Sequence, residues 1–297
     1  MAQGLRRAVL AAVMALAALL FTSGAHVSHA IIEGIEMPFE MEMPRIFRAA
    51  ALSPSVLTSA QQINTRRMLQ AFADAMPELR DAWTEPSFCD WSGVSCDRSS
   101  VHLSPSTLTV GGTLPDVPAD VDGSQVMLDT IMLFNFGTAV RGTLPDSWSR
   151  LTHLSSLNLA STSVSGTLPA SWAALTRLSF LSLFRTSVAG SLPPQWAGMT
   201  SLVTLTAYST QLSGTLPPEW SAMPAMSSLL LHSCLLSGRL PASWADMPRL
   251  ERLVLLGNSF CECVPQSWRA SRTLRVSIEP RHTAANCATA LSCLPTT

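Results

Sequence analysis

The stretch GTLPASWAALTRLSFLSLFRTSVA, residues 166–189, decides how this chain folds. Nearly the same stretch begins again, at even spacing, at four other positions: Gly142, Gly190, Gly214 and Gly238. A fixed period of this kind is the signature of a repeat protein, in which one unit cannot bury its apolar side chains alone but stacked units can. An irregular copy opens earlier, at Gly111, so we predict about six stacked repeats within residues 111–260.

Each repeat carries the apolar pattern L-x-x-L-x-L, which predicts a short β-strand. In the quoted repeat the pattern is formed by Leu178, Leu181 and Leu183. Alternation along a strand buries one face and exposes the other, and the glycine and proline before Trp172 turn the chain back. A unit this short leaves no room for the long crossover helix of an α/β sandwich. We predict an α/β-type solenoid with short parallel strands on its concave side and irregular or 3-10 segments on its convex side.

A small polar residue stands three positions after the strand in each repeat. Because the chain turns there inside the stack, we expect these side chains to accept hydrogen bonds from buried backbone amides. This polar ladder comprises Thr162, Thr186, Thr210, Cys234 and Asn258. Cys234 is then a small packing residue rather than a reactive thiol.

One tryptophan stands at the same position of every repeat, from Trp148 to Trp268. A row of aromatic side chains suggests sugar binding, but a structural stack on the convex side is the better explanation. Repeat proteins fill equivalent buried sites with the same side chain, and each indole can bury a large area against its neighbours.

The outward-facing strand positions on the concave side form the candidate binding surface. Serine and threonine dominate it, and larger side chains interrupt them at Phe180, Phe184, Tyr208, His232 and Arg252. Exposed aromatic residues on a rigid surface are typical of a contact patch, whereas packing between neighbouring strands explains the same residues equally well. A contact patch predicts that alanine at Phe184 and Tyr208 abolishes binding and leaves the melting temperature nearly unchanged. His232 would add pH sensitivity to binding.

The N-terminus has the pattern of an export signal. Arg6 and Arg7 precede the apolar run 8–21, and small residues follow it, so residues 1–30 are predicted to be a cleaved signal peptide. The run is shorter than the roughly 20 residues of a membrane-spanning helix, so we expect no transmembrane span in the mature chain. Residues 31–58 carry no repeat or cap pattern and are predicted to be a disordered spacer.

Export implies an oxidising compartment and therefore disulfide-bonded caps. The N-terminal cap, residues 59–110, has apolar residues at helical spacing followed by Cys89 and Cys96, which we expect to pair. The C-terminal cap, residues 261–297, has four cysteines: Cys261, Cys263, Cys287 and Cys293. A bond between Cys261 and Cys263 would be too tight, so we expect both to cross to Cys287 and Cys293, in either pairing.

Composition excludes several classes of function. The formal net charge is −1, and all 19 basic residues are arginine, so nucleic acid is not expected as a partner and lysine chemistry is absent. No Gly-rich phosphate loop, metal-spaced histidine cluster or nucleophile elbow occurs. We therefore expect a protein that is not an enzyme and uses no cofactor or metal.

Several motifs resemble known families. CDWSGVSC (89–96) together with SGTLPASWAALTRLSFLSL resembles the plant-type leucine-rich repeat with its cysteine-paired cap. Plant repeats usually carry leucine in place of the tryptophan and asparagine in place of the threonine. The repeat of this chain, with tryptophan and threonine at these positions, resembles the repeat of the promastigote surface antigen family of Leishmania and related kinetoplastids. LQAFADAMPELRDAW (69–83) and CECVPQSW (261–268) resemble the same family. The resemblance covers about residues 59–293 and implies a leucine-rich repeat solenoid.

What the resemblance implies about function is a non-enzymatic surface or secreted glycoprotein at the parasite–host interface, with roles in host-cell attachment and resistance to serum lysis. Members usually continue into a stalk and a hydrophobic tail that directs a lipid anchor, whereas this chain ends at LPTT. We therefore expect a secreted or cell-surface location without an anchor signal.

Recognition of a protein or glycan by the concave face is the leading functional hypothesis. The expected partner is a host cell-surface or serum protein, or an anionic glycan meeting a basic group near the C-terminus. That group comprises Arg269, Arg272, Arg275 and Arg281. The alternatives are a protease-resistant structural coat and an inhibitor of secreted hydrolases; the scarcity of charge on the concave face weighs against an inhibitor. Oligomeric state is not predicted.

Overall fold

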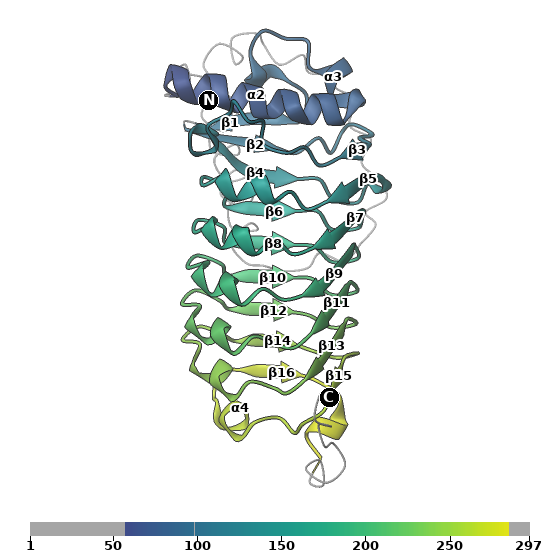
Figure 1. The fold of residues 1–297 in the computed structure, drawn as a ribbon, viewed down its shortest axis with the longest axis vertical. Coiled ribbons are helices and arrows are strands. Elements are labelled where there is room, and N and C mark those ends of the chain that lie inside the picture. Colours follow the sequence, from purple (N-terminus) through teal and green to yellow (C-terminus); the bar gives the residue numbers. More distant parts are fainter. Residues whose placement is uncertain (1–56, 98, 285–297) are drawn as a thin grey trace, which may run out of the picture. The chain divides into compact units, whose positions relative to one another are not determined.

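The computed structural model describes residues 57–97 and 99–284. Within them, short elements stack turn upon turn, and equivalent strands lie side by side (Figure 1). The predicted signal peptide and most of the predicted spacer lie outside the described residues, as do Cys287 and Cys293. The solenoid predicted from the repeat period is confirmed.

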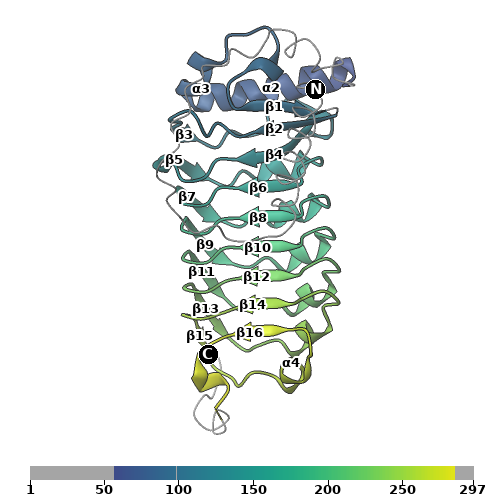
Figure 2. The ribbon, with the colours of Figure 1, turned by 180° about the vertical axis from the view of Figure 1, so that it is seen from behind.

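A nine-stranded sheet forms one side of the stack (Figure 2). Its outer face carries the outward strand positions that were predicted to form the concave binding surface. Its strands are β1 (Val94–Asp97), β2 (Ser100–Leu103), β4 (Leu128–Met132), β6 (Ser156–Asn158), β8 (Phe180–Ser182), β10 (Thr204–Thr206), β12 (Ser228–Leu230), β14 (Arg252–Val254) and β16 (Arg275–Ser277). Apart from the antiparallel β1–β2 pair, neighbouring strands are parallel. Leu157, Leu181 and Leu205 lie opposite one another and are fully buried, because the repeat places each at the same inward position.

A second, seven-stranded parallel sheet was not predicted. Its strands are β3 (Gly112–Thr113), β5 (Gly137–Thr143), β7 (Thr162–Thr167), β9 (Ser187–Ser191), β11 (Gln211–Gly214), β13 (Leu235–Gly238) and β15 (Ser259–Phe260). Val164 is buried between the half-buried Ser163 and Ser165, as strand alternation requires. Gly166 ends this stretch at φ 81°, and a β-carbon there would lie 3.0 Å from Cγ2 of Thr143. The recurring glycine therefore allows close stacking as well as a turn.

The tryptophans form a continuous buried stack. Each indole is 0–2% exposed, and neighbouring rings are nearly parallel at centroid separations of 6.0–6.3 Å from Trp148 to Trp268. Each indole N–H also donates to a proline carbonyl one repeat earlier, as Trp196 does to Pro169 at 2.9 Å. The structural interpretation of the tryptophans is confirmed, because no sugar can reach rings this deeply buried.

Short helices carry these tryptophans. They are the 3-10 helices Asp146–Arg150, Ala170–Ala174, Pro194–Gly198, Pro218–Ala222 and Ala242–Asp246, and the α-helix α4 (Gln266–Ala270). Each of them follows a proline, whose fixed φ presets the backbone for a turn, and before the five 3-10 helices this proline is in extended conformation. The predicted irregular or 3-10 side of the solenoid is therefore confirmed.

The polar ladder is buried, but its hydrogen bonds run opposite to expectation at the threonines. The Thr186 hydroxyl donates to the carbonyl of Leu183 at 2.7 Å rather than accepting from an amide, and Thr162 and Thr210 do the same. Cys234 is a buried free thiol 3.4 Å from the Thr210 hydroxyl. Among the ladder residues, only Asn258 accepts from a backbone amide, that of Leu236, because its longer side chain carries both an acceptor and a donor. The main role of the ladder threonines is therefore to donate hydrogen bonds to buried backbone carbonyls.

The N-terminal cap begins at Leu57, which is buried, and Thr58 caps helix α2 (Ser59–Ala75) with a capping box. Pro77 then starts a second helix, α3 (Pro77–Ala82), so the apolar spacing seen in the sequence is shared between two helices. A 3-10 turn (Phe88–Asp90) leads into β1, and the predicted Cys89–Cys96 disulfide is present. It holds Trp91, which stacks on Trp83 at 4.9 Å.

The C-terminal cap adds the last strand and a 3-10 turn (Pro280–His282). His282 is fully buried, with Nδ1 2.7 Å from the carbonyl oxygen of Glu262. Cys261 and Cys263 are both disulfide-bonded. Their crossing to Cys287 and Cys293 stays a prediction, since those two cysteines lie outside the described residues.

Candidate functional site

Three rings form a column on the outer face of the nine-stranded sheet. The Phe184 and Tyr208 rings stack at a centroid separation of 4.7 Å and an interplanar angle of 3°, and Tyr208 stacks on His232 at 4.2 Å and 12°. All three side chains are half-buried. The rings therefore do both things that the sequence left open: their faces pack against neighbouring repeats while part of each ring stays accessible.

Backbone hydrogen bonds hold this aromatic column in place beyond the ends of the strands. The amide of Arg185 donates to the carbonyl of Tyr208 at 3.0 Å, and the amide of Ser209 donates to His232 at 3.0 Å. Arg185, Ser209 and Ser233 each adopt φ of 55°, a left-handed conformation that is uncommon for residues other than glycine. This bend follows each ring residue directly, so the column stands at the edge where the chain leaves the sheet.

The column is longer than the sequence indicated. Phe134 occupies the equivalent position two repeats before Phe184, since Met132 pairs with Asn158 and the amide of Asn135 donates to Ala160. Ala160, the position between them, is only 1% exposed. At the other end Leu256 follows His232, and Phe134 and Leu256 are 38% and 42% exposed. The six column residues are Phe134, Ala160, Phe184, Tyr208, His232 and Leu256.

Phe134 was not predicted because the sequence analysis assumed a fixed repeat period. Tyr208 follows Phe184 by one full repeat, but the interval from Phe134 to Ala160 is longer than a repeat because the early copy is irregular. Aligning the irregular copy by its strand rather than by its period would have found Phe134.

Phe180 and Arg252 do not join the aromatic column. Both occupy the first outward position of their strands, since Phe180 pairs with Thr204, Thr204 with Ser228, and Ser228 with Arg252. Three of the five predicted surface residues, Phe184, Tyr208 and His232, therefore stack on one another. The other two, Phe180 and Arg252, lie in a parallel row and are three strands apart.

The surroundings of His232 favour its neutral form. Burial, followed by the positive charge of Arg252, lowers the pKa of His232 below its usual 6.5. Its Nδ1 is buried and has no hydrogen-bond partner among the described residues. A neutral ring packs against Tyr208 without the cost of desolvating a charge.

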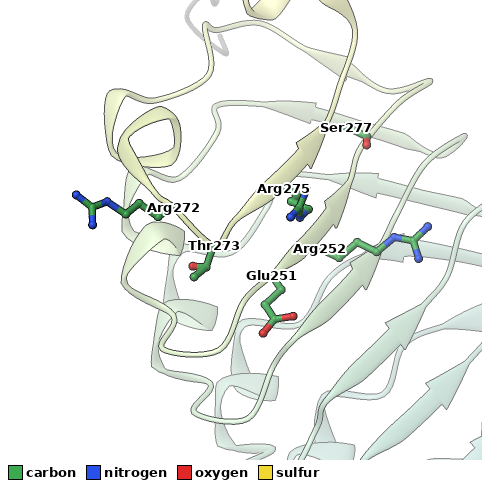
Figure 3. Close-up of a pocket in the computed structure, with 6 residues that line it drawn as sticks. All are labelled: Glu251, Arg252, Arg272, Thr273, Arg275 and Ser277. Atoms are coloured by element: carbon green, nitrogen blue, oxygen red, sulfur yellow. The ribbon is translucent and has the colours of Figure 1, made fainter. Parts of the chain in front are cut away.

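Arginines line a hollow at the C-terminal end of the same face (Figure 3). It measures about 580 Å³ and is lined by Glu251, Arg252, Arg272, Thr273, Arg275 and Ser277. Arg252 pairs in register with Arg275 on the neighbouring strand β16. The sequence placed Arg275 in a general basic group of the cap and missed strand β16, because the interval from Arg252 to Arg275 falls just short of a full repeat.

The other end of the face has a polar cluster without catalytic geometry. The Ser155 hydroxyl donates to Asp129 at 2.8 Å, and Nδ1 of His102 lies 3.8 Å from the same carboxylate. The serine therefore faces an acceptor carboxylate rather than a histidine base, so it is not activated as a nucleophile. Among the described residues, no group of three or more histidine, cysteine or acidic side chains is arranged to hold a metal ion.

Comparisons with known proteins agree with this architecture. No protein-family model matches the chain. The chain is 40% identical over 164 residues to the surface membrane glycoprotein GP46/M-2 of Leishmania amazonensis; the match covers 54% of this chain and 30% of that protein. The resemblance inferred from the motifs is confirmed, and the chain spans less than a third of this relative's length.

Solved structures show the same fold. The crystal structure of PEPR1–AtPEP1 matches with a TM-score of 0.64 at 22% identity, covering 74% of this chain and 32% of that one. A plant ice-binding protein matches at 0.57 and 22% identity, covering 75% and 71%. The plant peptide hormone receptor RGFR1 in complex with RGF2 matches at 0.52 and 26% identity, covering 60% and 29%. Across residues 57–97 and 99–284, no helix combines the length and apolar character needed to cross a membrane.

Proposed function

Because the chain is a leucine-rich repeat protein similar to a Leishmania surface glycoprotein, we propose that it is a non-catalytic recognition protein. It acts in secreted form or at the cell surface, at a parasite–host interface. Its ligand is a host protein, which it binds through the aromatic column on the outer face of the nine-stranded sheet.

The stacking of the column carries this proposal. Tyr208 has another ring stacked on each of its two faces, and Phe184 and His232 each have one face covered by Tyr208. A sugar that packs on aromatic rings needs a free ring face, whereas apolar side chains of a protein can lie along ring edges. The column is therefore better suited to a protein than to a glycan, and contact patches of proteins are rich in such side chains.

Rigidity is the second support. The column stands on register-paired strands and a buried tryptophan stack, so little conformational freedom is lost when a partner binds. Few charges lie near its middle: within residues 151–230 only Arg177, Arg185 and Glu219 are charged. The contacts that a partner makes with the column itself should therefore depend weakly on salt.

The test is saturable binding of the labelled chain to host phagocytes and to serum proteins. Two substitutions, Ser209→Arg and Ser233→Arg, block the column without touching the rings. Both sites are exposed and have the same φ of 55° as Arg185, so arginine is already accepted in this conformation. We expect the double variant to weaken binding at least about tenfold. Ser187→Arg with Gln211→Arg, which adds the same charge at two exposed sites of the second sheet, is the matched control.

Alanine variants are less suitable than the sequence suggested. Tyr208 takes part in two ring stacks, so Tyr208→Ala should itself lower stability by about 1–3 kcal/mol. Equal binding by the blocked variant and the parent chain would exclude the column as the contact surface. Absence of any saturable binding, from a chain that resists proteases, would favour a structural coat.

A further inference from the structure

We propose that the hollow formed by Arg252, Arg272 and Arg275 binds a carboxylate of an extended peptide segment whose apolar side chain lies on the neighbouring end of the aromatic column. This inference deepens the proposed function and rests on it. The ligand is then a peptide with a carboxylate and, before or after it in the peptide, an apolar side chain.

The first support is an unfavourable arrangement of like charges. Arg252 and Arg275 lie directly opposite each other on adjacent parallel strands, both exposed, where neighbouring strands are about 4.8 Å apart. Like charges at paired positions destabilise a sheet. An anion between them would reverse this effect, because each guanidinium could donate to it.

The second support is that these arginines lack partners that other arginines have. Arg239 pairs with Glu262 at 2.7 Å, and Arg150 donates to three backbone carbonyls. In the part of the chain that the structure describes, no ion pair or side-chain hydrogen bond involves Arg252, Arg272 or Arg275. Their donors remain available to a ligand.

The hollow itself favours a carboxylate. Its lining has three arginines and a single acidic residue, Glu251 (Figure 3). A guanidinium presents a planar fork of donors that matches the two oxygens of a carboxylate. The hollow is open on the surface of the sheet, so the contact remains hydrated and should contribute modestly, with a clear dependence on salt.

The position of the hollow relative to the column sets the spacing of the ligand. Arg252 and Leu256, the C-terminal residue of the column, are four residues apart on one strand and its exit. Four residues of extended chain span about 13 Å. A peptide lying along this strand therefore places a carboxylate in the hollow and an apolar side chain at Leu256 and His232 when the two are separated by about four residues.

A sulfated polysaccharide fits these observations less well. Such a chain carries anionic groups along its whole length and needs basic side chains at matching intervals. On this face the paired arginines lie at one end, and the row that begins with Arg252 continues away from the hollow through the uncharged Ser228 and Thr204. One anionic anchor next to an apolar contact is the pattern of a peptide.

The experiment measures binding of short fluorescent peptides to the full chain by fluorescence polarisation. The first peptide has a glutamate four residues from a leucine, in a serine background, with an amidated C-terminus. A second replaces the glutamate with glutamine, and a third keeps glutamine but has a leucine placed four residues before a free C-terminal carboxylate. Comparing the three separates a side-chain carboxylate from a terminal one.

The double variant Arg252→Gln with Arg275→Gln tests the hollow. Arg177→Gln with Arg249→Gln, which removes the same charge at two exposed sites outside it, is the matched control. We expect the double variant to lose about tenfold in affinity for a carboxylate peptide and to bind the amidated glutamine peptide unchanged. Raising the salt concentration should reduce the difference in affinity for a carboxylate peptide between the parent chain and the double variant.

Three outcomes would overturn the inference. The first is unchanged affinity of the double variant for both carboxylate peptides. The second is no measurable binding of either peptide at about 1 mM. The third is a heparin fragment that binds more tightly than the peptides and is lost in the double variant, which would make a polysaccharide the ligand. Binding of a host protein that is lost with Ser209→Arg and Ser233→Arg, but kept in the arginine double variant, would leave the proposed function standing and remove only this inference.

Discussion

Replacing Trp196 with leucine tests how much the buried tryptophan stack contributes to folding. Trp196 is fully buried and stacks on Trp172 at 6.3 Å and on Trp220 at 6.2 Å. Its indole N–H donates to the carbonyl of Pro169, which also accepts from the backbone amide of Trp172. Leucine, the residue usual at this site in plant repeats, removes both stacks and the indole hydrogen bond.

The expected loss follows from these contacts. Two aromatic pairs contribute about 1–3 kcal/mol beyond their buried area. The hydrogen bond contributes about 0.5–1.5 kcal/mol, and no more, because the Pro169 carbonyl keeps its second donor. The missing volume adds about 1–2 kcal/mol, less than for alanine because leucine fills part of the space. We expect Trp196→Leu to lower the free energy of unfolding by about 4 kcal/mol.

Two companion variants separate these contributions. Trp196→Phe keeps a ring between its neighbours and loses the donor, so we expect a loss of about 1–2 kcal/mol. Trp268→Leu removes a ring that stacks only on Trp244 within the described residues, so it should cost about 1 kcal/mol less than Trp196→Leu. Urea unfolding followed by far-UV circular dichroism measures all three, with m-values compared to detect partial unfolding of the stack. A loss below about 1 kcal/mol for Trp196→Leu would refute the contribution of stacking.

Two further predictions concern His232 and the polar ladder. Because the pKa of His232 is lowered in the folded chain, its contribution to stability is complete above pH 6.5 and is lost as the pH falls below that value. Melting curves near neutral and near acidic pH should show a smaller acid-induced loss for His232→Phe than for the parent chain, and equal losses would contradict this. Thr186→Val removes the hydrogen bond to Leu183 and should cost about 1 kcal/mol in urea unfolding. The same change at the exposed Thr167 should cost less than about 0.5 kcal/mol, and equal costs would argue against the ladder.

Much of the fold could be predicted because residues at the same position of successive repeats occupy equivalent places in the stack. Leu157, Leu181 and Leu205 occur at a constant spacing, and stacking then places them opposite one another in the core. The same reasoning aligned Phe184, Tyr208 and His232. It failed where the spacing changed, at Phe134 and Arg275, since a fixed period assigns those residues to the wrong place.

The second sheet escaped prediction for a different reason. The alternation around Val164 extends over only a few residues and contains a glycine, a composition as typical of turns as of strands. These segments become strands because the first sheet and the tryptophan stack bring neighbouring copies close enough to pair.

The sequence by itself determined the repeat solenoid, the buried role of the tryptophans and the Cys89–Cys96 disulfide, because each depends only on which positions are equivalent or close along the chain. The tertiary structure decided how side chains at those positions are used. Whether the Thr186 hydroxyl donates or accepts, and whether ring faces or edges of Tyr208 meet solvent, depends on backbone angles and on distances between strands. Periodicity carries no information about either. It also did not reveal that Arg252 and Arg275, two of the three arginines of the hollow, lie opposite each other in the folded chain.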